Sequence, residues 1–315
     1  MIFGINGWLA GQVLCKLLIY SALAAIIGGV FCLKLAPFAR SLMAAMKNYL
    51  LAVVILGLLA SILAFFLKVG YLAESGIGGM FDALYLKILW GSSVGTATAW
   101  QVSGFGVLVV AVFWLVLGNA YSPTNLTADV LRSYFIWILT ALGVLMVVSS
   151  IAMVGHSAGL NVPAQIAIGL HVFVGLWWLG SLVPLQLYCS KLANAQLHQL
   201  MHRFGQAALV MVLMLIASGG WVALQLFSSP AELVSTNYGR NFLIKISFVI
   251  GLLGLALWHK ARLVPRLLKS PSAANSLMSS IRIETLIGIA VLVACLLYTS
   301  PSPRDLSTSR MPSSA

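Results

Sequence analysis

Charged residues are scarce in this sequence, and acidic residues are the scarcest of all. Only 8% of the 315 residues are charged, and Asp and Glu together number 6. A soluble globular domain carries about 25% charged residues. An ordinary soluble domain is therefore excluded, and the composition is typical of a protein that crosses a membrane many times.

Cysteine pairs and the usual catalytic and nucleotide-binding motifs are also missing. The 4 cysteines form no CxxC and no regular spacing, so a disulfide framework is not expected. The sequence has no phosphate-binding glycine loop, nucleophile elbow or metalloprotease helix motif. Its loops are too short to hold an ATPase domain. We therefore expect neither an enzyme nor an ATP-driven pump.

Long apolar runs occupy the sequence instead. Hydrophobic residues make up 61% of the chain, and the mean hydropathy is +1.03. A membrane-spanning helix needs about 20 mostly apolar residues. Eight runs meet or approach this length: 11–36, 48–68, 99–119, 131–154, 165–189, 205–227, 241–260 and 281–298. We predict an all-α, polytopic integral membrane helix bundle with about eight transmembrane helices.

The basic residues predict how the bundle is oriented. A net charge of +12 would suggest nucleic acid as the partner of a soluble protein. Here the basic residues are spread between apolar runs, so we expect the lipid bilayer as partner and no nucleic acid. Most follow the first, fifth and seventh runs: Lys34, Arg40, Lys47, Lys191, Arg203, Lys260, Arg262, Arg266, Lys269 and Arg282. The positive-inside rule places these loops in the cytoplasm and both termini outside.

We divide the sequence into two membrane parts and a tail. Residues 1–130 hold three runs and a long outer loop, and residues 131–294 hold the other runs. Residues 295–315, CLLYTSPSPRDLSTSRMPSSA, switch abruptly to Ser, Pro and Arg. They resemble the read-through of a transposase-type sequencing adapter, so we predict a cloning or assembly scar there. The alternative is a short native tail.

Two histidines lie at the edge of an apolar run or inside one. His156 follows the fourth run in GHSAG, and His171 lies about 10 Å below the outer surface in the fifth run. The short connection lets His156 fold back toward His171, and Met153 precedes His156 by one helical turn. Imidazole with thioether suits copper, and no carboxylate is near enough to favour Mg²⁺, Ca²⁺ or Mn²⁺. We predict an outward-facing copper site formed by His156, His171 and Met153.

Other interpretations of these histidines remain open. A transmembrane histidine often hydrogen-bonds across a bundle, and methionine is a common gap filler. Two transmembrane histidines can also ligate haem, which gives a haem-binding or electron-transfer protein as the alternative function. That alternative needs both rings inside facing helices, whereas His156 is predicted to lie in a loop.

The remaining ionisable groups in the apolar runs have simpler expected roles. Glu284 is expected to form a structural ion pair near Arg282 and the basic loop before it, with proton coupling as the weaker alternative. His259, beside Lys260, is expected to anchor the membrane edge. The adjacent Trp177 and Trp178 are expected to pack rather than to take part in chemistry.

Five segments in order carry a family resemblance: VGHSAG, LHVFVGLWWLGSLVPL, HRFGQAAL, TNYGRNFLIKISFVIGLLGLALWHKARLVPRL and RIETLIGIAVL. Across about Met153 to Leu292 the sequence resembles the copper resistance protein D family of bacterial inner-membrane proteins. The resemblance places His156 and His171 at the family's Gly-His and Leu-His positions. Here His259 replaces a frequent Asn, and the first run lacks the histidine that many relatives carry.

The resemblance implies a function. The family is associated with copper handling in the inner membrane and is thought to move copper toward the cytoplasm. It often occurs with a periplasmic copper-binding partner of the copper resistance C type. We therefore expect a multi-pass inner-membrane protein that transports copper ions and contributes to copper resistance or homeostasis.

Overall fold

The computed structural model describes residues 7–36, 40–117, 126–154, 161–226, 229 and 231–298. Eight long helices fill these segments: α1 Gly7–Leu35, α2 Arg40–Ala73, α4 Ser93–Leu117, α5 Leu126–Ala152, α6 Val162–Lys191, α7 Asn194–Leu226, α9 Asn237–Trp258 and α11 Ala273–Tyr298. All eight contain a stretch long and apolar enough to cross a membrane. No strand occurs in the described segments. The predicted all-α bundle with eight membrane-spanning helices is confirmed.

Short helical elements connect the long ones. The loop after α2 holds η1 Ile77–Phe81 and α3 Ala83–Trp90. Asp82 caps α3, because its side chain accepts hydrogen bonds from the backbone nitrogens of Leu84 and Tyr85. Toward the C-terminus, α8 Glu232–Ser235 precedes α9, and the π-helical turn η3 His259–Leu263 and α10 Val264–Arg266 follow it.

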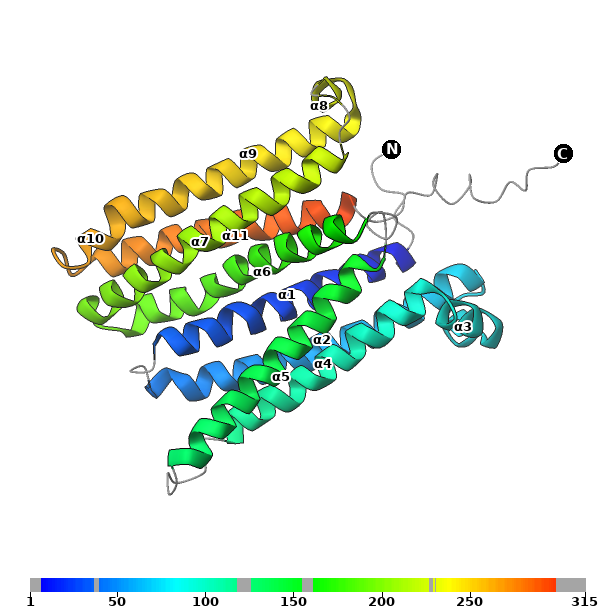
Figure 1. The fold of residues 1–315 in the computed structure, drawn as a ribbon, viewed down its shortest axis with the longest axis horizontal. Helices are drawn as coiled ribbons and strands as arrows, with labels where there is room; N and C mark the ends of the chain where they lie inside the picture. Colours follow the sequence, from blue (N-terminus) through cyan, green and yellow to red (C-terminus); the bar gives the residue numbers. More distant parts are fainter. Residues whose placement is uncertain are drawn as a thin grey trace.

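Helix α1 runs through the middle of the bundle (Figure 1). It packs against α2 on one side and α6 on the other. The α4 and α5 helices pair with each other and complete the N-terminal side, while α7, α9 and α11 lie on the C-terminal side. The two sides therefore meet mainly where α1 crosses α6.

Small residues bring α1 and α6 into direct backbone contact. A Cβ atom added at Gly28 would overlap the backbone of Gly180 and Ser181, and one added at Gly180 would overlap the backbone of Ala24. Ala24 and Gly28 lie one turn apart, so they form the small-xxx-small pattern that lets membrane helices approach closely. Farther along the crossing, the Tyr188 hydroxyl donates a hydrogen bond of 3.1 Å to the Cys32 carbonyl. This crossing fixes one face of α6 against α1.

Candidate functional site

His171 is held on α6 by a well-defined helix start. The Asn161 side chain accepts a hydrogen bond of 3.0 Å from the Ala164 nitrogen, and Pro163 occupies the first turn. His171 follows nine residues after Val162, which is about 13 Å along the helix. Its side chain remains exposed at the junction of α6 and α7.

The His171 ring faces α7. Its Nδ1 lies 3.2 Å from the Leu215 carbonyl oxygen and 3.5 Å from the Ser218 hydroxyl. Gly219 makes room for the ring, because a Cβ atom there would lie 2.8 Å from the His171 Cε1 atom. The sequence of α7 thus provides both the hydrogen-bond acceptor and the space that orient the imidazole.

This contact determines which ring nitrogen is available. A carbonyl oxygen only accepts hydrogen bonds, so Nδ1 carries the proton and donates. In the neutral ring, Nε2 then has a free lone pair, and no hydrogen bond of the described residues involves it. A backbone carbonyl on one imidazole nitrogen is the arrangement that commonly orients a metal-binding histidine. His171 therefore has the orientation and protonation that ligation through Nε2 requires.

Of the other two predicted ligands, the structure describes Met153 but not His156. Met153 follows the end of α5, and its backbone nitrogen donates to the Ser149 carbonyl. Helices α5 and α6 are in contact, with Val148 against Gly169. From that contact, Met153 lies five residues toward the end where α5 leads into α6, and His171 lies two residues in the opposite direction. The two residues are therefore separated by about 10 Å along the helices. His156 lies outside the described residues, so the three-residue site stays a prediction.

No ready-made metal cluster occurs in the described part of the chain. No group of three or more His, Cys, Asp and Glu side chains there could hold a metal ion.

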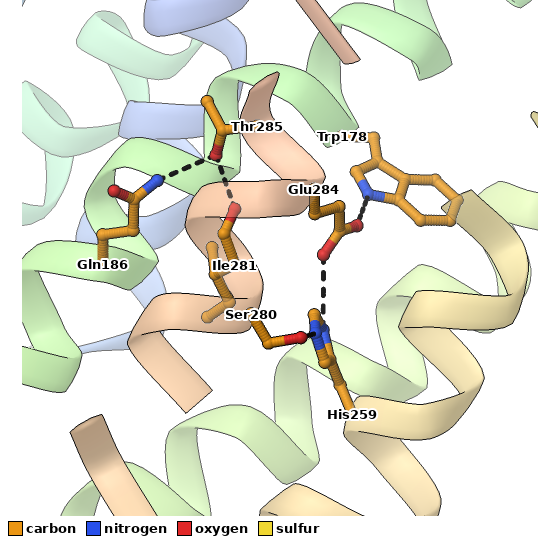
Figure 2. Close-up of polar contacts among 7 residues, drawn as sticks. All are labelled: Trp178, Gln186, His259, Ser280, Ile281, Glu284 and Thr285. Atoms are coloured by element: carbon orange, nitrogen blue, oxygen red, sulfur yellow. Dashed lines mark hydrogen bonds and ion pairs between the residues drawn. The ribbon is translucent and has the colours of Figure 1, made fainter. Parts of the chain in front are cut away.

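A second polar cluster lies deeper along α6 (Figure 2). Glu284 of α11 is only 2% exposed, and its Oε1 accepts a hydrogen bond of 2.6 Å from the Trp178 Nε1. Its Oε2 lies 3.3 Å from the His259 Nδ1, and the His259 Nε2 lies 2.6 Å from the Ser280 hydroxyl. The cluster joins α6, η3 and α11 through polar contacts on both carboxylate oxygens.

The structural ion pair expected for Glu284 is found with His259, while the exposed Arg282 guanidinium contacts the Met278 sulfur at 3.7 Å. One expectation about this cluster was wrong. His259 is not a membrane-edge anchor, because its side chain is 12% exposed and turns inward to Glu284. It is the first residue of the π-helical turn, a distortion that often occurs at functional sites.

A third contact extends this polar layer. The Gln186 side-chain nitrogen donates a hydrogen bond of 2.8 Å to the Thr285 hydroxyl, which itself donates to the Ile281 carbonyl (Figure 2). Thr285 adjoins Glu284 on α11, and Gln186 lies on α6 with Trp178. Helices α6 and α11 are thus joined by polar contacts at two levels within the apolar bundle.

Comparison with known families decides where this chain belongs. A family described as copper resistance protein D matches residues 198–297, and one described as copper resistance protein D-like, N-terminal domain, matches residues 6–166. The chain belongs to the copper resistance protein D family. The resemblance drawn from the sequence is confirmed, and membership indicates a role in copper resistance for this multi-pass membrane protein. No curated protein and no solved structure gave a match.

The polar residues discussed above fall in different parts of the two family matches. His259 and Glu284 lie within the copper resistance protein D match, and Met153 and His156 lie within the N-terminal domain match. His171 and Trp178 lie between the two matches. Sequence reasoning missed the contact between Trp178 and Glu284, although an acid inside a membrane helix is a signal for a specific partner.

Proposed function

We propose that this protein transports copper across the bacterial inner membrane toward the cytoplasm, as its contribution to copper resistance. Copper ion is the substrate. His171 is the described residue that would take it up on the outer side, together with His156 and Met153. A periplasmic copper-binding protein of the copper resistance C type is the proposed donor of the ion.

The free Nε2 of His171 is the observation that carries this proposal. Its Nδ1 is fixed by the Leu215 carbonyl, which leaves a single nitrogen directed for ligation. His259 differs, because both of its ring nitrogens already contact Glu284 and Ser280. Of these two rings, only His171 can bind a metal ion without breaking a hydrogen bond.

The same face of α6 offers a route inward. His171, Gly175 and Trp178 lie at positions i, i+4 and i+7, which share one face of a helix. A Cβ atom added at Gly175 would meet no heavy atom within 4 Å. There is therefore room for a side chain at Gly175, which lies along the helix between the proposed uptake residue and the Trp178 and Glu284 contact. This arrangement supports passage along α6, with the inner cluster holding the helices in place.

The proposal is tested by copper uptake into proteoliposomes that contain the purified protein. His171→Ala should abolish most of the uptake, while the matched variant His202→Ala should retain it. His202 is a suitable control because it lies on α7, is exposed and contacts Gln206 of the same helix. Equal uptake by both variants would contradict the assignment of His171. A Soret band lost in His171→Ala would favour the haem-binding alternative instead.

A further inference from the structure

A cavity of about 430 Å³ lies between the ends of four helices on the N-terminal side of the bundle. It is lined by residues near the C-terminal ends of α1 and α4 and near the N-terminal ends of α2 and α5. Typical ligand pockets have about 300–1,000 Å³, so the cavity is large enough for a small molecule or a lipid headgroup. It lies far from His171, on the side that the basic loops assign to the cytoplasm.

Every charged side chain among the described lining residues is positive. Lys34, Lys47 and Arg132 line the cavity together with the hydroxyls of Ser133 and Thr140. Lys47 is 8% exposed and lies seven residues into α2, about 10 Å from the helix start.

The basic side chains are oriented by their surroundings. One guanidinium nitrogen of Arg132 donates a hydrogen bond of 2.9 Å to the Trp114 carbonyl, which holds the planar group at the cavity wall. A guanidinium carries five N–H donors in all. The Lys34 Nζ lies 4.8 Å from the centre of the Trp137 ring, and both residues line the cavity. Arginine and lysine in this combination favour phosphate, which accepts from the guanidinium fork and from ammonium groups.

Apolar side chains form the rest of the wall. They are Val30, Leu33, Met43, Ala111, Val112, Leu115 and Ile136. A cavity that is basic on one part of its wall and apolar on another matches a phosphate group attached to a glycerol and acyl chain. Basic pockets between membrane helices on the cytoplasmic side commonly bind anionic lipid headgroups.

We infer that this cavity binds a phosphate group that Lys34, Lys47 and Arg132 recognise, carried by an anionic phospholipid or by free phosphate. The site is independent of copper transport, because none of its residues lies in α6, α7 or α11. A bound phosphate would neutralise the basic ends of α1, α2 and α5 and hold the four helices together on this side of the membrane.

The test is a binding titration of the purified full chain in detergent. The probes are dihexanoyl phosphatidylglycerol, dihexanoyl phosphatidylcholine and inorganic phosphate, and affinity is measured by calorimetry. The anionic lipid should bind at least about tenfold more tightly than the zwitterionic one, because the three basic side chains would repel the choline cation beside the phosphate of the latter. Lys47→Gln with Arg132→Gln should remove this preference, and Lys269→Gln, which alters an exposed lysine outside the cavity, should not.

The outcomes separate the two sources of phosphate. If inorganic phosphate competes with the lipid, the site is supported and its ligand is phosphate from either source. If only the lipid binds, the site is supported and its ligand is a membrane phospholipid. Equal affinity for both lipids, or an unchanged preference in the double variant, would overturn the inference. Should the double variant not fold, the single Arg132→Gln must weaken binding and Arg132→Lys must retain most of it.

Discussion

Removing the Glu284 carboxylate should destabilise the bundle by leaving two partly buried partners without their acceptor. The carboxylate accepts from Trp178 at 2.6 Å and lies 3.3 Å from His259. A hydrogen bond between transmembrane helices contributes about 0.6–1.7 kcal/mol, and a hydrogen bond to a charged group contributes about 1.5–3 kcal/mol. Because alanine can make neither interaction, Glu284→Ala should lower the free energy of unfolding by about 2–4 kcal/mol.

The assay is reversible unfolding of the purified protein in mixed micelles, followed by tryptophan fluorescence. Arg282→Ala is the matched control, because it also removes a charged side chain from α11, two residues away from Glu284. The Arg282 side chain is exposed and contacts the Met278 sulfur. The control should show no measurable change in stability. If Glu284→Ala were no less stable than Arg282→Ala, the interactions in Figure 2 would not stabilise the fold and the reasoning would be refuted.

Glu284→Gln separates hydrogen bonding from charge. The amide oxygen of glutamine can still accept from Trp178, and its NH₂ group can donate to His259 Nδ1. His259 would then place its proton on Nε2 and donate to the Ser280 hydroxyl, so each partner keeps a hydrogen bond. We expect less than half of the destabilisation caused by Glu284→Ala. Destabilisation as large as that of alanine would mean that the cluster depends on the negative charge itself.

Two further substitutions test the path along α6 and the helix crossing that supports it. Gly175→Leu should place a bulky side chain on the face of α6 between His171 and Trp178, where a Cβ atom would meet no neighbour within 4 Å. Transport into proteoliposomes should fall severalfold with Gly175→Leu and be retained with Gly175→Ala. Gly28→Ala should lower the thermal unfolding midpoint markedly, because its Cβ would overlap the α6 backbone, whereas Gly106→Ala, with no neighbour within 4 Å, should not.

Hydropathy predicted the number and kind of helices but underestimated their lengths. Helix α2 extends over Arg40–Ala73 and α7 begins at Asn194, although the apolar runs begin at residues 48 and 205. An apolar run measures only the part that is buried in hydrocarbon. The intrahelical hydrogen bonds continue into polar residues at both ends, where hydropathy carries no signal.

Side-chain partners could be predicted much less well, because they depend on how each helix is rotated. The short loop after α5 correctly predicted that α5 and α6 are neighbours. However, Gly169 faces α5, and His171, two residues later, points about 200° away, toward α7. The same geometry explains why Glu284 contacts His259 rather than Arg282, since residues two apart on a helix do not face each other. The convergence of Arg132 on Lys34 and Lys47 also depends on how α5 packs, and α5 is distant in sequence from α1 and α2.

The two faces of α6 have different roles in the proposed transport site: one is fixed against α1, and the other carries His171 and Trp178. One face presents Gly180 to the backbone of α1, and the close contact leaves little freedom for the helices to slide. The opposite face presents His171 to α7 and Trp178 to α11. A metal ligand must be positioned to within a fraction of an ångström, and a helix locked along one face can hold the other face that rigidly. We therefore expect that movements accompanying copper transfer occur where α7 and α11 meet α6, while the α1 and α6 crossing stays fixed.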